Sequence, residues 1–223
     1  MDLTRRLLAE FIGSAMLAGV VIGSGILAVA VSAGNDGVAL LGNTAATAAI
    51  LWVLVATLGP VSGAHFNPAV TVAFAVRREI GLPVAAIYVA VQVIGCIAGA
   101  ILAHAMFELP LIQAGATDRS GAAKMLSEGV ATFALVFAIF GAIRYAPKAV
   151  PAAVALVITA GYWWTASTSF ANPAITVARA LSDTFAGVRP ADVPGFVVAQ
   201  LCGALLATGI CAFLFRPAPD EAN

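Results

Sequence analysis

The sequence predicts an all-α membrane protein with six transmembrane helices and two re-entrant half-helices, arranged as an inverted repeat. Three observations support this fold class. Of the 223 residues, 61% are apolar and 10% are charged, whereas about 25% of the residues of a soluble domain are charged. Apolar stretches of roughly 20 residues recur, which is the length that crosses a hydrocarbon core of about 30 Å. A segment that begins with Asn-Pro-Ala occurs once in each half of the chain.

The apolar stretches predict the six spans. We place them at about 7–30, 38–58, 83–107, 122–143, 147–168 and 193–215. The first stretch is too long for a cleaved signal peptide and contains Glu10. With the N-terminus inside, seven cations fall on the cytoplasmic side (Arg5, Arg6, Arg77, Arg78, Arg144, Lys148 and Arg216) and four outside (Arg119, Lys124, Arg179 and Arg189). The positive-inside rule therefore predicts a multi-pass protein of the inner (plasma) membrane with both termini cytoplasmic.

The two Asn-Pro-Ala segments belong to a longer internal repeat. Six of seven residues agree between 67–73 and 172–178. Each half carries a Glu in its first span and a Gln in its last, namely Glu10 with Gln92 and Glu128 with Gln200. Three spans per half is an odd number, so the second half runs through the membrane in the opposite sense. We expect a single channel domain over residues 1–223, made of halves at about 1–115 and 116–223.

Each Asn-Pro-Ala predicts the start of a helix, because Asn is a good N-cap and Pro is favoured at the first helical position. The helices expected at 67–77 and 172–182 are about 16 Å long, which is half a bilayer. They are therefore expected to be re-entrant, with their positive N-terminal ends meeting at mid-membrane. The amides of Asn67 and Asn172 can donate to a passing oxygen there. Such a path conducts neutral polar molecules and opposes cations and protons.

On these residues the chain resembles the aquaporin, or major intrinsic protein, family. Ser-Gly-Ala-His-Phe-Asn-Pro-Ala-Val-Thr at 62–71 is close to the first signature of that family, and the resemblance covers nearly the whole chain. It implies a pore in each protomer and a homotetramer. The pore motifs would be Asn67, Pro68, Ala69, Asn172, Pro173 and Ala174. The pore-lining carbonyls would come from Gly63, Ala64, His65, Ser169, Phe170 and Ala171. Glu10 and Glu128 would brace the loops, which agrees with the need of an intramembrane carboxylate for donors.

Two smaller expectations concern polar residues near these loops. We expect Gln92 and Gln200 to make interhelical hydrogen bonds rather than to contact solute. His65 is expected to support its loop rather than to relay protons.

The same resemblance implies a filter of four side chains near the outer mouth. Counting from the Asn-Pro-Ala motifs places them at Thr47, Ala160, Ser169 and Ile175. Ile175 stands where the family normally has Arg, and water-selective members carry an aromatic residue and a His at the first two positions. The expected opening is wide and has few donors. Two residues bear on it further. Arg179, one helical turn later, either supplies the missing charge or pairs with Asp183 at the interface, and Phe170 is a candidate to refill part of the space.

A filter without Arg resembles that of the bacterial aquaporins found in arsenic-resistance gene clusters. It implies a passive channel for small uncharged solutes, such as arsenous acid or glycerol-like polyols, together with water. A water-selective aquaporin is the first alternative. A coupled secondary transporter is less favoured because only Glu10 and Glu128 are ionisable candidates at the midplane. An intramembrane enzyme would need a nucleophile with a base, or metal ligands, and neither His65 nor His104 has a carboxylate pair beside it.

The remaining composition gives no sign of other partners. Cys96, Cys202 and Cys211 lie in apolar runs without a CxxC pair, so neither a disulfide framework nor a metal site is predicted. No cofactor is expected. Lys plus Arg and Asp plus Glu both number 11, which does not favour nucleic-acid binding. The predicted partners are membrane lipid and small neutral solutes.

Overall fold

The computed structural model describes residues 1–216, and over this range it contains helices and loops but no strand. The long helices are α1 (Leu3–Val31), α2 (Asp36–Ser62), α4 (Leu82–Met106), α5 (Ala122–Tyr145), α6 (Val150–Trp164) and α8 (Val193–Leu214). The short ones are α3 (Pro68–Val76) and α7 (Pro173–Arg179), with 3₁₀ turns η1 (Pro147–Ala149) and η2 (Pro190–Asp192). The predicted fold class is confirmed. The end of the predicted second half, residues 217–223, lies outside the described range.

The boundaries differ from the predicted ones in two places. The fifth span, expected at 147–168, is a 15-residue helix at 150–164, because the chain must leave the helix to form the loop before Asn172. Among the described residues, α1, α2, α4, α5 and α8 are long and apolar enough to cross a membrane, whereas α6 is shorter than such a span. The half-helices contain 9 and 7 residues, fewer than the expected 11. Beyond α3, Arg78 adopts a left-handed φ of 62°, which ends the helical path.

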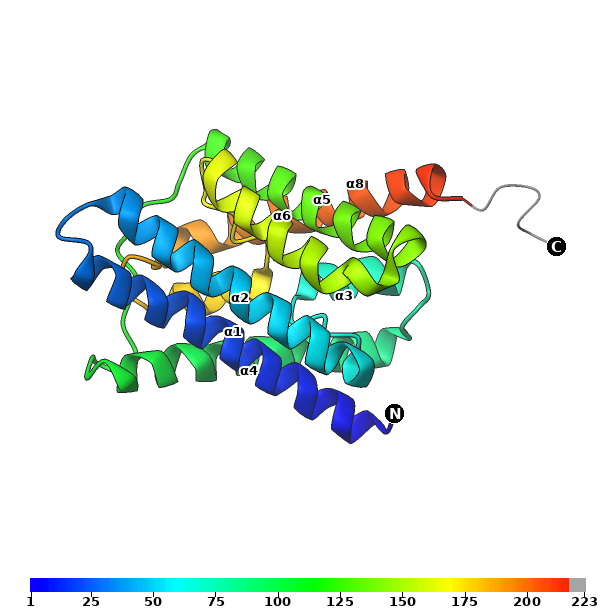
Figure 1. Cartoon of the computed structure of the whole chain (residues 1–223), viewed down its shortest axis with the longest axis horizontal. Coiled ribbons are helices and arrows are strands. Elements are labelled where there is room, and N and C mark those ends of the chain that lie inside the picture. Colours follow the sequence, from blue (N-terminus) through cyan, green and yellow to red (C-terminus); the bar gives the residue numbers. More distant parts are fainter. Residues whose placement is uncertain (217–223) are drawn as a thin grey trace.

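The long helices pack in two equivalent sets, one from each half. In the first half α1 lies against α2 and α4, and in the second half α5 lies against α6 and α8. The sets meet along α2 and α6, and each short helix packs on the other half, α3 on α8 and α7 on α4. Figure 1 shows α3 and α7 (yellow-orange) reaching from the middle of the bundle toward opposite ends. This crossed packing is what an inverted repeat requires. The boundary near residue 115 stays a prediction.

Glycines set the closest helix contacts, at corresponding places in the two halves. A Cβ at Gly95 of α4 would meet the Phe11 carbonyl oxygen of α1, and a Cβ at Gly203 of α8 would overlap the Gly129 carbonyl oxygen of α5. Small residues allow such approach and are typical of helix interfaces in membranes. The glycines thereby bring the two Glu-bearing helices against the two Gln-bearing helices.

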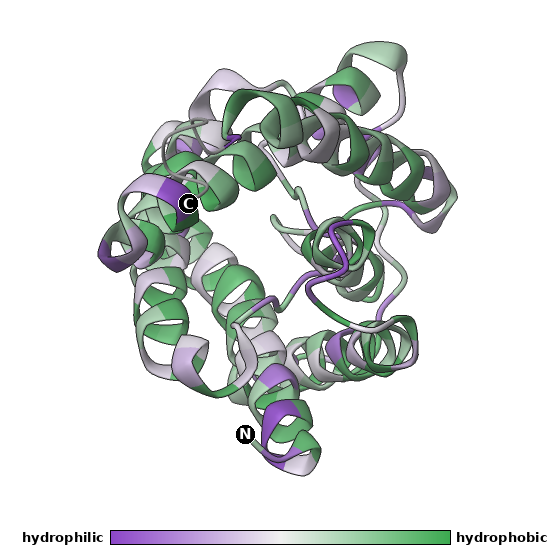
Figure 2. Ribbon diagram, turned by 90° about the vertical axis from the view of Figure 1, so that its right-hand side faces the viewer, coloured by the Kyte–Doolittle hydropathy of each residue, from purple (hydrophilic) through white to green (hydrophobic). Residues whose placement is uncertain are grey.

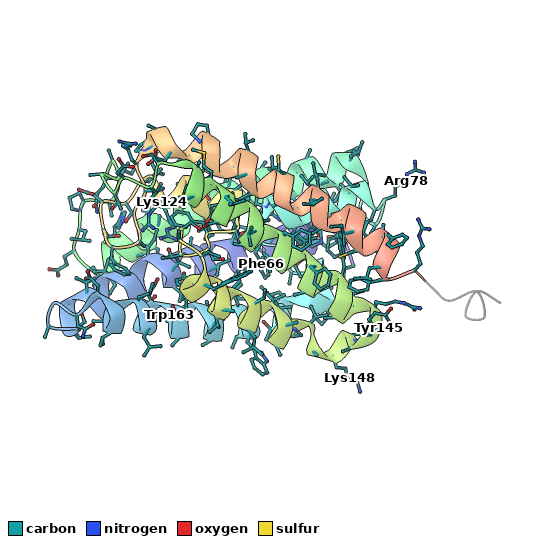
Figure 3. The ribbon with its side chains drawn as sticks, turned by 90° about the horizontal axis from the view of Figure 1, so that it is seen from above. Phe66, Arg78, Lys124, Tyr145, Lys148 and Trp163 are labelled. Carbon is teal, nitrogen blue, oxygen red and sulfur yellow. The ribbon has the colours of Figure 1, made fainter. Side chains whose placement is uncertain are left out.

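The outer surface of the bundle is apolar along its length. Figure 2, which looks along the bundle, shows hydrophobic residues over most of the helices that surround a central segment. Large side chains such as Trp52, Trp163 and Leu206 are more than half exposed in the single chain, which suits a lipid solvent. Figure 3 places Arg78 and Lys148 at one end, Lys124 in the other half and Phe66 between them. The start of α1 and the end of α8 lie at the same end (Figure 1).

Candidate pore

The two half-helices begin next to each other in the centre of the bundle. Asn67 and Asn172 are their N-caps, with nearly identical backbone angles (φ −156° in both, ψ 117° and 112°). Asn67 Oδ1 accepts from Ala69 N at 2.9 Å, and Asn172 Oδ1 accepts from Ala174 N, also at 2.9 Å. Each side-chain oxygen therefore caps its own helix, and the amide nitrogen of the same side chain points away from that helix.

The amide nitrogens join the two halves by reciprocal hydrogen bonds. Asn67 Nδ2 donates to the Ala171 carbonyl oxygen at 2.7 Å, and Asn172 Nδ2 donates to the Phe66 carbonyl oxygen at 2.8 Å. Each amide has two N–H groups, so one is used across the interface and one is left to face the space between the helices. Both Asn residues line a cavity there.

The loops before the half-helices have strained and equivalent backbones. Left-handed φ angles occur at Gly63, Ala64 and Phe66 in the first loop, and at Thr168, Ser169 and Ala171 in the second. Non-glycine residues in this region cost about 1–3 kcal/mol each and persist only where the surroundings hold them. Except for Thr168, these residues line the cavity, together with His65 and Phe170. The strain thus serves to place loop backbone at the cavity wall.

Two buried carboxylates hold the loops. Glu10 accepts from Ser62 Oγ, His65 N, Phe66 N and Gln92 Nε2 at 2.7–3.0 Å. Glu128 accepts from Phe170 N and Ala171 N, both at 2.8 Å, and from Gln200 Nε2 at 2.6 Å. Both side chains are fully buried. Buried polar groups are stable only when hydrogen-bonded, so each carboxylate and its loop satisfy one another.

The two glutamines also connect the long helices to the half-helices. Gln92 Nε2 donates to Thr71 Oγ1 on α3, and Gln200 Nε2 donates to Thr176 Oγ1 on α7, both at 2.9 Å. His65 Nδ1 lies 3.1 Å from Thr71 Oγ1. The hydroxyl proton of Thr71 is donated to the Asn67 carbonyl oxygen, so His65 is the donor in this pair. This geometry is that of a loop support.

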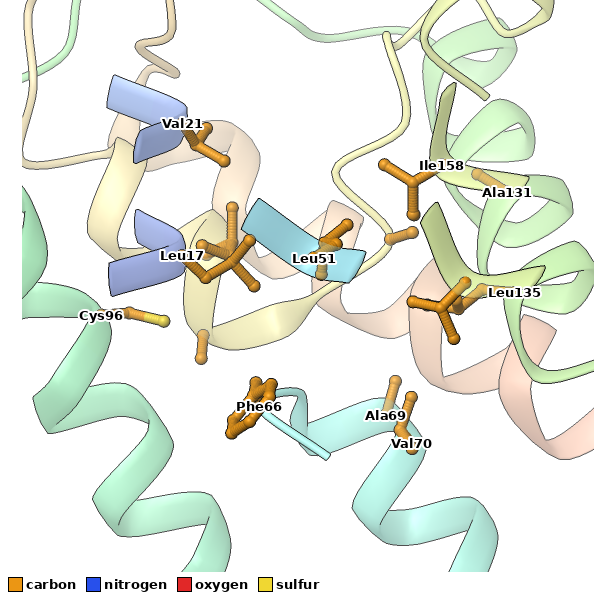
Figure 4. Close-up of a cluster of buried hydrophobic side chains, with 14 of the residues drawn as sticks. Leu17, Val21, Leu51, Phe66, Ala69, Val70, Cys96, Ala131, Leu135 and Ile158 are labelled. Carbon is orange, nitrogen blue, oxygen red and sulfur yellow. The ribbon is translucent and has the colours of Figure 1, made fainter. Parts of the chain in front are cut away.

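A continuous cavity of about 90 Å³ runs past both Asn residues, several times the roughly 10–15 Å³ that one water needs. On one side of the Asn pair its wall is mostly aliphatic, including Leu135, Ile139 and Val150. Figure 4 shows Leu17, Leu51, Leu135 and Ile158 extending toward a shared space above Phe66 and Val70. A path with polar atoms at its centre and apolar walls can pass single molecules without binding them tightly.

Three of the four predicted filter residues line the cavity: Thr47, Ser169 and Ile175. The prediction of Ala160 is wrong. Ala160 is exposed on the outer face of α6, and the wall is formed by Ile158 and Tyr162 instead. Counting back from Asn172 failed because the intervening loop is not helical, so residue number does not give the facing direction. Tyr162 Oη lies 3.3 Å from Thr47 Oγ1.

Arg179 lies on the cavity wall and is buried. Its Nε donates to the Ala186 carbonyl oxygen, and its Cζ lies 3.3 Å from the centroid of the Phe170 ring. Asp183 instead accepts from Ala116 N at 3.0 Å. The expectation that Arg179 pairs with Asp183 is therefore wrong. Phe170, by contrast, does line the cavity.

Sequence reasoning missed two contributors to this site. Phe66 supplies the carbonyl oxygen that Asn172 binds, and nothing in its side chain signals that role. Tyr162 could have been found from spacing, because the wall residues Val150, Val154, Ile158 and Tyr162 recur every four positions on α6, as one face of a helix does. The described residues hold no cluster of His, Cys, Asp and Glu that could bind a metal ion.

Comparison with known proteins gives consistent relatives. Residues 1–148 match the family model described as major intrinsic protein. The chain is 53% identical over 217 residues to the aquaglyceroporin AqpS of Rhizobium meliloti, covering 97% of this chain and 93% of that protein. It is 29% identical to aquaporin NIP6-1 of Arabidopsis thaliana over 99% of this chain and 72% of the relative.

A solved structure has the same fold. The X-ray structure of the aquaglyceroporin from Plasmodium falciparum superposes with a TM-score of 0.80, covering 99% of this chain and 100% of that one. Its sequence identity is 16%, so this likeness concerns the arrangement of helices alone.

Proposed function

Because the chain belongs to the major intrinsic protein family, whose members are membrane channels and not enzymes, we propose that it is a passive channel with a wide filter. Its cargo would be small uncharged solutes of about glycerol size, together with water. Glycerol-like polyols and neutral metalloid acids such as arsenous acid have the required size and charge. The channel would need neither a cofactor nor ion coupling.

The observation that carries this proposal is Ile175. It directly follows the second Asn-Pro-Ala, its side chain lines the cavity, and it is 4% exposed. Isoleucine offers no donor and no charge, whereas arginine would bring five donors and a longer side chain to the same place. Thr47 and Tyr162, whose hydroxyl oxygens lie 3.3 Å apart, also line the cavity. A solute with several hydroxyl groups can exchange hydrogen bonds with these side chains without meeting a guanidinium at position 175.

The relatives support the wider class of solute. The Rhizobium meliloti protein is named an aquaglyceroporin, and it aligns with nearly the whole chain. From that name we infer that glycerol-like molecules also pass through this channel. Passage of arsenous acid is supported by size, neutrality and the residue at position 175.

The proposal includes the setting of the channel. The apolar exterior suits a membrane, and we propose the inner membrane with both termini in the cytoplasm, because Arg78 and Lys148 lie at one end of the bundle (Figure 3) and cations favour the cytoplasmic side. A homotetramer is proposed from the family resemblance.

Solute flux into liposomes tests the proposed cargo. Purified protein is reconstituted, and swelling is followed by light scattering with water alone, glycerol, urea and arsenous acid, for the wild type and Ile175→Arg. We expect the wild type to pass glycerol and arsenous acid. We expect Ile175→Arg to suppress these solutes about 10-fold or more and water by less, since a factor of 10 needs only about 1.4 kcal/mol.

Ile175→Met is the matched control, because methionine lengthens the side chain without adding charge or donors. It separates the effect of bulk from the effect of a guanidinium. Equal suppression of water and solutes by Ile175→Arg would refute the role of position 175. A wild type that passes water but none of the larger solutes would establish the alternative, a water-selective channel.

A further inference from the structure

Arg179 is a buried cation that has no counterion within residues 1–216. The residue is 3% exposed, and its guanidinium lies over Phe170. Within residues 1–216 its one hydrogen bond runs from Nε to the Ala186 carbonyl oxygen, and no carboxylate lies within ion-pair distance of it. The two Nη atoms are therefore left without a protein acceptor, at a side chain that forms part of the cavity wall.

A guanidinium in this position needs water. Removing an ion from water costs several kcal/mol, which a close carboxylate normally offsets. The Phe170 ring offsets part of this cost by a cation–π contact. The rest must come from solvent, and the cavity is the space into which this side chain faces. Water in the cavity would then hydrate Arg179, and the potential of this charge would act on molecules in the lumen.

The surrounding structure fixes where this charge lies. The backbone of residue 179 lies one turn of α7, about 6 Å, beyond that of residue 175, and the guanidinium of Arg179 lies over Phe170 in the loop before Asn172. Arg119 also lies near this ring: its Cζ is 5.0 Å from the Phe170 ring centroid, and its Nε donates to the Gly187 carbonyl oxygen at 2.8 Å. Val188 N donates to the Arg179 carbonyl oxygen at 3.2 Å. The loop that carries Ala186 is therefore held around the arginine.

Residues with hydroxyl side chains also line the cavity. Ser169 Oγ is buried and has no hydrogen-bond partner, although Ser169 lines the cavity. Tyr162 and Thr47 complete the hydroxyl set on the neighbouring helices. Among the described residues, the cavity lining therefore contains neutral hydroxyl groups but no carboxylate.

We propose that Arg179, which follows Ile175 by one helical turn, determines the charge selectivity of this channel. In this arrangement Ile175 sets the width of the lumen, whereas Arg179 excludes cations from the outer mouth. Selection by size then depends on Ile175, and selection by charge depends on Arg179. The inference rests on the proposed channel function, and the test below separates the two.

The test compares ion leak with solute flux in the same liposomes. Arg179→Met and Arg179→Gln remove the charge, and methionine keeps an unbranched stem on Phe170. Arg179→Lys keeps the charge, and Lys124→Gln is the control for losing a cation elsewhere in the outer half. Potassium leak is read with an entrapped potassium-sensitive dye, and glycerol flux is read by swelling.

We expect both uncharged variants to keep glycerol flux within about 3-fold of wild type and to raise potassium leak about 100-fold. That factor is the order expected when one unit charge is removed within several ångströms of a permeating ion at an effective dielectric constant of about 20. Arg179→Lys and Lys124→Gln are expected to leak as little as wild type. In the double variant Arg179→Met with Ile175→Arg, a charge at position 175 is expected to restore the barrier and to reduce glycerol flux.

Two results would overturn the inference. Unchanged potassium leak in Arg179→Met and Arg179→Gln, with glycerol flux intact, would show that the charge does not act on the lumen. Loss of glycerol flux in all three variants at this position would show that Arg179 serves as an anchor of its loop. A wild type without glycerol flux would instead contradict the proposed cargo, while the comparison of potassium leak between wild type and variants would still decide the role of Arg179.

Discussion

Glu128 offers a sharp test of how the irregular loops are held in the membrane. The change is Glu128→Ala, which removes a fully buried carboxylate that accepts three hydrogen bonds. Two of the donors are the backbone N–H groups of Phe170 and Ala171, and the third is Gln200 Nε2. The loop that they support contains left-handed φ angles of 53° at Ser169 and 48° at Ala171, a conformation that ordinary residues leave when released.

The expected cost follows from the donors left behind. Each buried donor without an acceptor costs about 1–3 kcal/mol, and lumen water can reach part of the loop because Phe170 and Ala171 line the cavity. The lower part of the range therefore applies, and we expect a loss of about 3–5 kcal/mol. At about 2–4 °C per kcal/mol for a chain of this size, the apparent midpoint of thermal unfolding would fall by about 6–20 °C.

The assay is thermal unfolding in detergent, paired with glycerol flux in liposomes, for Glu128→Ala and for Glu108→Ala. Glu108 is an exposed glutamate just after the end of α4. Glu108→Ala therefore removes one carboxylate that does not support a loop, and it serves as the control. We expect the control to stay within about 2 °C of wild type. If Glu128→Ala matched the control in both midpoint and flux, the carboxylate would not be holding the loop.

Three further predictions concern other parts of the structure. Gly203→Ala should lower the unfolding midpoint by several degrees, because its Cβ would overlap the Gly129 carbonyl oxygen, whereas Gly209→Ala, with no atom near its Cβ, should be neutral or slightly stabilising; equal midpoints would contradict the packing. Asn67→Asp keeps the helix cap but loses the hydrogen bond to the second loop, so we expect a loss of about 1–3 kcal/mol in the same assay, and no loss would contradict that bond. Tyr162→Ala should raise glycerol flux several-fold, whereas Ala160→Leu should leave it unchanged. The reverse pattern in the swelling assay would show that Ala160, and not Tyr162, belongs to the filter.

The sequence was informative wherever function depends on local rules. Asn67 and Asn172 could be predicted as helix starts because capping depends on one side chain and the next few backbone groups. Glu10 and Glu128 could be singled out because an acid inside an apolar span is costly without a role. These inferences needed no knowledge of how far apart two segments lie.

Sequence position does not predict the direction in which a side chain or a carbonyl group points when the backbone between two residues is irregular. Ala160 was placed by counting across a loop whose backbone is not helical, so the count gave no facing direction. The Phe66 carbonyl was missed because its role depends on a left-handed φ of 46° and not on its side chain. The environment of Arg179 depends on the later segment that bears Ala186, and no short pattern reports such a contact.

The crossed amide bonds of the two asparagines have a consequence for biogenesis. Asn67 binds an acceptor 104 positions later in the chain, and Asn172 binds one 106 positions earlier. At about 5–20 residues per second on the ribosome, the first re-entrant loop waits roughly 5–20 s before its mate has been synthesised. During that interval its strained backbone depends on Glu10, already present in the nascent chain. The permeation path is therefore completed late in membrane insertion. A fragment that ends before α7 would leave the first loop without the hydrogen bonds that join it to the second half.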